Sequence, residues 1–428
     1  MSTPAQSVGN RRASQPWLDN TKIAGRPLRF YLSGWRGGLI ALIIALVLPT
    51  AMSLGLVDPS LLVPAIAVGI YVLLALGLNI VVGYAGLLDL GYVAFFVIGS
   101  YTVATGSSGL LQAADGHTVI NIPQFSFWVL LPLGAVLAGF FGVLLGAPTL
   151  RLRGDYLAIV TLGFGEIVPI VFQNIPFFFG QLGMSALPPP PIGPIDFSNP
   201  LDRTAFYYLT VLLIALVVLA VVALRDSSLG RAWVAIREDE TAAQCSGVNL
   251  VRTKLLAFGL GAVTGGIGGA LNAGFLTAVA PSDFNFGISI TILVMIVLGG
   301  LGSIPGVIVG AIILRFVDVY LLGQLNQWVH GSVLVADNGA PLHFLSNFDF
   351  NTSKYLIYGL VLMIIILLRP QGLIPDVRRQ RELAGIGAAP ESMSVVGLVE
   401  QEEEAETAVP LTSDSFAGAG SDAQDREG

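Results

Sequence analysis

The run LLVPAIAVGIYVLLALGLNIVV, Leu61–Val82, decides the fold because none of its 22 residues is charged. A helix needs about 20 consecutive apolar residues to cross the hydrocarbon core of a bilayer. Similar runs recur along the chain, and hydrophobic residues make up 54% of the 428 residues while charged residues make up only 11%. The mean hydropathy is +0.77. So little charge cannot cover a soluble surface, and the sequence therefore predicts an all-α polytopic membrane protein.

Apolar runs bounded by glycine, proline or charge predict about ten transmembrane helices. The predicted spans are Gly37–Leu56, Leu61–Val82, Leu90–Thr105, Phe127–Ala147, Tyr156–Phe172, Ala205–Leu224, Lys254–Leu276, Phe286–Leu301, Val307–Leu322 and Tyr355–Leu368. Ten spans divide into two halves of five, and an odd number of spans per half places the halves in opposite orientations. We therefore expect two inverted five-helix halves.

The few charged residues predict the orientation, because cytoplasmic loops carry an excess of Lys and Arg. With the N-terminus inside, 18 of the 21 basic residues fall on the cytoplasmic side, Arg203 and Lys354 fall outside, and Arg315 lies within a span. Both termini are then cytoplasmic. The net charge of −7 comes from residues 376–428, which hold 12 acidic side chains and 4 arginines. We expect a basic N-terminal segment (1–36), a transmembrane domain (37–375) and an acidic, disordered tail (376–428).

Two irregular polar stretches flank short spans and are the first candidates for a substrate path. The third and eighth spans have 16 residues each, and they adjoin the stretches 83–91 and 280–287. Glycine or proline beside polar residues frees backbone groups, which at membrane depth survive only against protein or a watery cavity. The alternative is that both stretches are interfacial turns whose glycines allow close helix packing. The candidate path residues here are Tyr84, Asp89, Gly91, Asp283 and Asn285.

Charged side chains inside spans are costly and each requires an explanation. Glu166 is isolated in the fifth span, where it either lines the path or accepts bonds from a freed backbone or a cation. Arg315 and Asp318 lie three residues apart, so we expect them to form a structural ion pair. No charged partner for a proton relay is evident beside Asp89 or Glu166.

The inner loop 225–253 is predicted to contain a short helix that docks on a protein partner. Ser228 can cap its start and Gly247 can end it in the left-handed conformation. The alternative is a helix on the membrane surface, held there by arginines. Three consecutive acidic residues, 238–240, would be repelled by anionic lipid and favour the protein partner. The candidate docking residues are Arg231, Trp233, Ile236, Arg237, Glu238, Glu240, Ala242, Ala243 and Gly247.

Catalytic, metal and cofactor sites are not expected. Cys245 is the single cysteine, and the three histidines lie far apart in the sequence. A phosphate-binding loop needs a Gly-Lys pair, but none of the three lysines follows a glycine. If ATP drives transport, another subunit must hydrolyse it. Nothing in the sequence indicates nucleic-acid binding, and the bilayer is the expected environment.

Four motifs together resemble one family. The runs Gly83–Phe95, Leu152–Glu166, Gly230–Gly247 and Gly299–Gly306, with Arg369–Leu373 near the end, look like LivM-type permease subunits of branched-chain amino acid ABC transporters. The resemblance covers residues 60–375 and implies a bacterial importer in the cytoplasmic membrane. It implies as partners a second related permease, two ATPases docked on the coupling loop 225–253, and an extracytoplasmic binding protein. Thr241 interrupts the family's Glu-Ala-Ala pattern at Glu240, Ala242 and Ala243.

The function expected from this resemblance is uptake of branched-chain amino acids by alternating access. Two alternatives stay open. The motifs indicate the fold and the coupling loop but not the substrate pocket, so a permease of the same family for urea, short amides or other amino acids is the first alternative. A self-sufficient secondary carrier, with Glu166 and Asp89 handling an ion, is the alternative from another class.

Overall fold

The structure is a computed structural model that describes residues 22–23, 26–27, 61–112, 119–149, 155–185, 187–188, 190, 203–322, 324, 354–368 and 372–374. All of them belong to one compact unit, Met1–Pro375. The first predicted span, Gly37–Leu56, most of segment 1–36 and the whole tail 376–428 lie outside the described residues.

The described residues are mostly helical. The helices are α4 (Leu62–Leu78), the π-helix η2 (Asn79–Tyr84), α5 (Val93–Ser108), α6 (Phe127–Thr149), α7 (Asp155–Asn174), the short η3 (Pro176–Phe178) and η4 (Gly180–Leu182), α8 (Thr204–Asp226), α9 (Ser228–Glu238), α10 (Glu240–Cys245), α11 (Leu250–Leu276), η6 (Pro281–Asp283), α12 (Phe286–Gly299), α13 (Ile304–Phe316), the π-helix η7 (Val317–Leu321) and α16 (Lys354–Leu368). The strands form two small antiparallel hairpins, β1 (Lys22–Ile23) with β2 (Arg26–Pro27) and β3 (Leu110–Gln112) with β4 (Val119–Asn121).

Six stretches within the described part are long and apolar enough to cross a membrane. They are Leu62–Tyr84, Phe127–Thr149, Tyr156–Asn174, Thr204–Asp226, Leu250–Leu276 and Pro281–Gly299. Two shorter apolar helices, Val93–Ser108 and Lys354–Ile365, accompany them. The chain is thus a multi-pass, all-α membrane protein.

Two predicted boundaries are wrong for identifiable reasons. Helix α5 begins at Val93 and not at Leu90, because the Asp89 carboxylate bonds to the Gly91 N–H and forms a turn before the helix. Helix α11 begins at Leu250, before the predicted Lys254, because the Asn249 side chain accepts a bond from the Arg252 N–H and caps the helix there.

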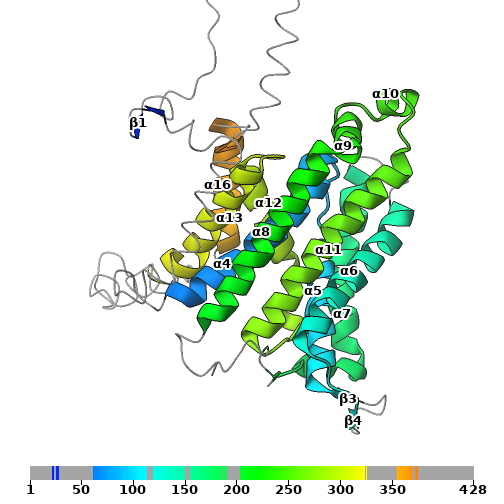
Figure 1. Cartoon of the computed structure of the whole chain (residues 1–428), viewed down its shortest axis with the longest axis vertical. Coiled ribbons are helices and arrows are strands. Elements are labelled where there is room, and N and C mark those ends of the chain that lie inside the picture. The colour runs from blue at the N-terminus through cyan, green and yellow to red at the C-terminus, as the bar shows by residue number, and fades with distance from the viewer. Residues whose placement is uncertain are drawn as a thin grey trace, which may run out of the picture. The chain divides into compact units, whose positions relative to one another are not determined.

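Helix α11 lies at the centre of the described helices, packed against α4, α5 and α6 (Figure 1). Glycines allow this close approach: a Cβ atom on Gly99 of α5 would lie only 2.2 Å from the Gly266 carbonyl oxygen of α11. Small residues at such crossings are typical of membrane helices.

Elements from both halves of the sequence pack together around α4. Helices α8, α12 and α13 all contact α4, and α16 packs against α12. Helices α9 and α10 lie at one end of the bundle, and the β3–β4 hairpin lies at the other (Figure 1). The two stretches predicted to form a substrate path therefore lie inside a single packed assembly.

Candidate substrate path and docking helix

The first turns of the two short helices, α5 and α12, contact each other. The Val93 N–H donates a hydrogen bond to the Ser289 hydroxyl at 3.1 Å, and both residues are buried. Next to this bond, the Phe96 and Phe284 rings meet with centroids 5.2 Å apart. Helix α5 has 16 residues and α12 has 14, so both are shorter than the roughly 20 residues that a crossing needs, and α12 approaches that length only together with η6. The structure thus joins the two short helices that the sequence paired.

The segment before α5, residues 85–92, is locked against α7. The Asp89 carboxylate accepts a bond from the Gly91 N–H at 2.9 Å, and the Leu90 N–H donates to the Thr161 hydroxyl at 3.1 Å. A Cβ atom on Gly91 would lie 2.1 Å from the Thr161 carbonyl oxygen. Gly91 therefore provides close packing, as the alternative interpretation of this stretch expected.

Asp89 borders a small cavity. Its side chain is 2% exposed, and its Oδ2 atom has no hydrogen-bond partner within the described structure. The cavity has a volume of about 10 Å³ and is also lined by Thr149, Thr161 and aromatic side chains. That volume holds about one water molecule. An amino acid cannot reach Asp89 in this conformation.

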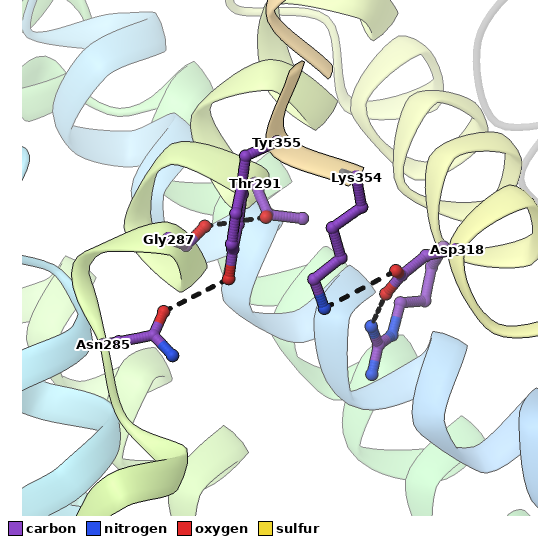
Figure 2. Close-up of polar contacts among 7 residues, drawn as sticks. Asn285, Gly287, Thr291, Asp318, Lys354 and Tyr355 are labelled. Atoms are coloured by element: carbon purple, nitrogen blue, oxygen red, sulfur yellow. Dashed lines mark hydrogen bonds and ion pairs between the residues drawn. The ribbon is translucent and has the colours of Figure 1, made fainter. Parts of the chain in front are cut away.

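The segment before α12, residues 280–285, is open in comparison. Asp283 and Asn285 are both exposed. The Tyr355 hydroxyl of α16 donates a 3.3 Å hydrogen bond to the Asn285 side-chain oxygen (Figure 2). The Tyr355 ring lies so close to α12 that a Cβ atom on Gly287 would lie 2.3 Å from its hydroxyl oxygen. Tyr355 thus covers the first turn of α12.

A cluster of three charged side chains lies near Tyr355. Arg315 and Asp318 form the predicted ion pair, and the Lys354 ammonium lies 3.8 Å from Asp318 (Figure 2). The Arg315 guanidinium lies 4.0 Å from the centre of the Tyr71 ring of α4. Asp318 belongs to the π-helix η7, which continues α13. The cluster therefore connects α4, α13 and α16.

The other two path candidates, Tyr84 and Glu166, differ in exposure. Tyr84 is 5% exposed within η2. Glu166 lies on the exposed face of α7 beside Ile167 and Ile170, and it forms no hydrogen bond or ion pair with a described residue. A carboxylate in the middle of an apolar helix requires water or a protein partner opposite it. Among the described residues, no three His, Cys, Asp or Glu side chains are grouped to hold a metal ion.

The predicted cytoplasmic helix is present, but its cap and its length differ from the prediction. The Ser227 side chain, and not Ser228, accepts the capping bond, from the Gly230 N–H. The helix is broken into α9 and α10, because the Asp239 carboxylate accepts bonds from the Thr241 and Ala242 N–H groups and starts a second helix. The Ala242 and Thr241 bonds also lower the pKa of Asp239.

Three predicted docking residues point into the protein. Trp233 is 0% exposed, and its indole N–H donates to the Thr253 carbonyl at 2.8 Å. Ile236 and Ala243 are 3% exposed each. These side chains anchor α9 and α10 to the membrane helices, so they are not part of the exposed surface of α9 and α10.

The remaining docking candidates divide into two groups. Glu240 forms an ion pair with Lys254 of α11 at 2.5 Å, and the Arg237 guanidinium donates a hydrogen bond to the Gly83 carbonyl. The other candidates are exposed: Arg231, Glu238, Ala242 and Gly247. Gly247 has a φ of +86°, which confirms the predicted left-handed conformation at this position. A Cβ atom there would meet nothing within 4 Å.

The chain matches the model of a protein family described as the permease component of branched-chain amino acid transport systems, over residues 61–367. The chain belongs to this permease family. It is 38% identical to the high-affinity branched-chain amino acid transport system permease protein LivM of Escherichia coli K12, over 81% of this chain and 76% of the relative. The permease family and its transport role confirm the resemblance found in the sequence.

More distant relatives include two further permeases. The probable branched-chain amino acid transport permease protein LivM of Methanocaldococcus jannaschii is 26% identical over 72% of this chain and 91% of the relative. The permease protein LivH of Salmonella typhimurium is 26% identical over 62% of this chain and 87% of the relative. No solved structure matches the chain.

Several residues of the permease site escaped the sequence argument. Asn79 accepts a 3.0 Å hydrogen bond from the Gly302 N–H, and an amide inside the apolar run Leu61–Val82 was the available signal. Ser289 in the first turn of a short span gave a similar signal. Tyr355 gave none, since an aromatic residue at the end of a membrane helix is common in any membrane protein.

Proposed function

We propose that this permease is the transmembrane subunit of an ATP-driven importer that moves branched-chain amino acids by alternating access. A second related permease, two ATPases and an extracytoplasmic binding protein complete the transporter. The 38% identity to a LivM protein supports the substrate class. The observation that carries the mechanism is the Val93–Ser289 contact, where two short helices from the two halves of the chain meet inside the bundle.

The proposed architecture is ten transmembrane helices in two inverted halves, with both termini in the bacterial cytoplasm. Helix α11 begins beside α10 at the Lys254–Glu240 pair, and its 27 residues carry the chain about 40 Å away at 1.5 Å per residue. Segment 280–285 thus lies toward the end opposite α10, whereas segment 85–92 follows η2, which contacts α9. Short helices entered from opposite ends are what an inverted repeat requires.

The proposed substrate path runs along the α5–α12 contact. The exposed Asp283 and Asn285 form its accessible end, while Tyr84, Asp89 and Gly91 form its closed end. A helix N-terminus favours a negative group, so the start of α12 suits the carboxylate of an amino acid. The aromatic rings near Phe284 suit an aliphatic side chain.

Glu166 completes the path on the side of the second permease. Its exposed position on an apolar helix is compatible with the membrane only if the second subunit or a watery space covers it. A carboxylate at that place also suits the ammonium group of an amino acid. The similarity to LivH, a different permease of the same kind of system, supports pairing with a related subunit.

The proposed ATPase contact is the exposed surface of α9 and α10. This surface consists of Arg231, Glu238, Ala242 and Gly247. The buried side chains of Trp233, Ile236 and Ala243 anchor it to the membrane helices. Replacement of Gly247 by Trp places a large side chain in open space on this surface. We expect ATPases to be lost from the purified complex, although the positive φ also strains any residue with a Cβ atom.

The experiment that tests the function is uptake of labelled leucine by liposomes containing the chain, its sister permease and the two ATPases, with binding protein outside and ATP inside. We expect uptake only with all components. Uptake of urea or a short amide in preference to leucine would change the substrate class. Uptake by the single chain driven by an ion gradient would show a secondary carrier and refute the proposal.

A further inference from the structure

One arginine of α9 bonds to a distant membrane helix. Arg237, near the end of α9, donates a hydrogen bond through Nη1 to the Gly83 carbonyl, 154 residues earlier in the chain. Gly83 belongs to η2, a π-helix, and such irregular turns are often found at functional sites. Arg231 on the same helix is exposed and donates instead to the nearby Asp226 carbonyl at 3.3 Å. The two arginines of α9 thus have different surroundings.

The Arg237 side chain also lies beside the turn that connects α12 with α13. A Cβ atom on Gly302 in this turn would lie 3.5 Å from Arg237 Nη1. The Gly302 N–H in turn donates to the Asn79 side chain of η2 at 3.0 Å. A Cβ atom on Gly86 would lie 2.8 Å from Arg237 Cγ. The half-buried side chain therefore lies between η2, the residues that follow it, and the 300–303 turn.

These neighbours are the ends of both candidate path elements. Helix η2 continues into segment 85–92, which precedes α5. The 300–303 turn ends α12, whose other end begins after Asn285. One side chain therefore lies beside the segment that precedes α5 and the turn that follows α12, and the first turns of these two helices contact each other at Val93 and Ser289.

Helices α9 and α10 are each attached to the start of α11. Trp233 of α9 donates a hydrogen bond to the Thr253 carbonyl, and Glu240 of α10 forms an ion pair with Lys254. Two neighbouring residues of α11 thus contact α9 and α10, respectively. Beyond this attachment, Arg237 provides a charge-assisted hydrogen bond from α9 to η2.

We propose that Arg237 is a positioning residue that transmits movement of α9 and α10 to η2 and the 300–303 turn, and that it does not contact the ATPases. The inference rests on the proposed function, since it assumes that ATPases dock on α9 and α10. It assigns to Arg237 a role different from that of the exposed docking residues. Force applied to the docking surface reaches the α5–α12 contact through this guanidinium.

The test uses the complete transporter, with all four membrane-associated subunits and the binding protein, carrying Arg237→Gln, Arg237→Lys or Arg231→Gln. Four quantities are measured: ATPase copurification, basal ATP hydrolysis, its stimulation by substrate-loaded binding protein, and uptake per ATP hydrolysed. For Arg237→Gln we expect normal copurification, basal hydrolysis within about twofold of wild type, and about tenfold lower uptake per ATP, since loss of a hydrogen bond to a charged group weakens coupling by about that factor.

The other two variants separate transmission from docking. Arg237→Lys keeps the charge and a donor and should restore part of the uptake per ATP. Arg231→Gln changes an exposed arginine of the same helix, so it should keep the wild-type ratio of uptake to hydrolysis even if it weakens ATPase binding. If Arg237→Gln fails to fold, Arg237→Lys decides, with lower uptake per ATP in an intact complex as the expected result.

Two results would overturn the inference. One is loss of ATPases from the Arg237 variants with normal uptake per assembled complex, which would make Arg237 a docking residue. The other is a wild-type ratio of uptake to hydrolysis in these variants. Failure of the proposed function is recognised separately, because the wild-type complex itself would then show no uptake coupled to ATP.

Discussion

Segments 85–92 and 280–285 both precede a short helix, yet their surroundings are opposite. The first is mostly buried, with Asp89 only 2% exposed, and its Gly91 packs directly on the backbone of α7. The second has Asp283 and Asn285 exposed. Its Phe284 packs on Phe96 and a backbone bridge joins the preceding Val279 to Met184, but its exposed end is held by one side chain of α16, Tyr355. Backbone contacts cannot move without moving a helix, whereas a side chain can rotate. On the proposed substrate path, the α12 side is therefore the more exposed one in this conformation and the α5 side is the more buried one.

The largest expected effect is that of Gly91→Ala in the closed segment. The new Cβ atom would lie 2.1 Å from the Thr161 carbonyl oxygen, so either α7 or segment 85–92 must shift. Overpacking of this kind costs about 1–3 kcal/mol, and more where only backbone can give way. We expect the melting temperature of the purified protein in detergent to fall by several degrees, with loss of uptake.

Gly287→Ala, in the first turn of α12 next to the open segment, is the matched control. Its Cβ atom would lie 2.3 Å from the Tyr355 hydroxyl, which is the far end of a side chain that can rotate away. We expect a much smaller fall in melting temperature than for Gly91→Ala. In a Tyr355→Ala background, adding Gly287→Ala should cause no further fall. Equal losses for Gly91→Ala and Gly287→Ala would show that the two segments are equally rigid and would contradict the comparison.

Asp318→Ala should have the next largest effect, because it removes the one carboxylate shared by two cations beside the open segment. Arg315 and Lys354 would then face each other near Tyr71 without compensation. Since these side chains are 19% and 34% exposed, we expect a loss of about 1–3 kcal/mol, less than for a fully buried pair. Thermal unfolding in detergent measures it.

Lys354→Ala serves as the control for this cluster. Its ammonium is 3.8 Å from Asp318, and the Arg315–Asp318 pair remains in the variant, so the expected loss is about 0–1 kcal/mol. A loss as large as that of Asp318→Ala would mean that Lys354, and not Arg315, is the main partner of the carboxylate.

The sequence predicted much of this comparison but not its asymmetry. Helix length and polar flanks identified both segments, because apolar periodicity and glycine or proline positions act locally. Whether a segment is buried depends on its neighbours. Nothing near Asp89 in the sequence indicates that Thr161 lies against it, and nothing near Asn285 indicates Tyr355.

The docking helix shows the same limit. The sequence placed a helix in loop 225–253 and a left-handed Gly247, but it treated every residue of that helix as part of the surface. Which face turns inward was decided by α11, through Thr253 and Lys254. The alternation of apolar and charged residues along a short helix does not show whether its apolar face packs against a partner or against the protein's own core.

Asp89→Ala should destabilise the closed segment moderately. The Gly91 N–H would lose its acceptor, and an unsatisfied buried donor costs about 1–2 kcal/mol. Asp89→Asn retains a side-chain oxygen for this bond and should melt within about a degree of wild type. If the Asn variant were as unstable as the Ala variant, the negative charge of Asp89 would matter more than its bond to Gly91.

Asn285→Ala should have the smallest effect on stability and a selective effect on transport. It removes a 3.3 Å bond from an exposed residue, so we expect a change within about 0.5 kcal/mol in thermal unfolding. Uptake should nevertheless show a KM several times higher at unchanged maximal rate, because the amide is lost from the accessible end of the proposed path. Tyr355→Phe removes only the hydroxyl that bonds to Asn285, and it should leave KM closer to wild type. A lower melting temperature with unchanged KM for Asn285→Ala would contradict this expectation. Segment 280–285 would then be a structural turn like segment 85–92. The exposure of a segment in this conformation would not indicate where substrate enters.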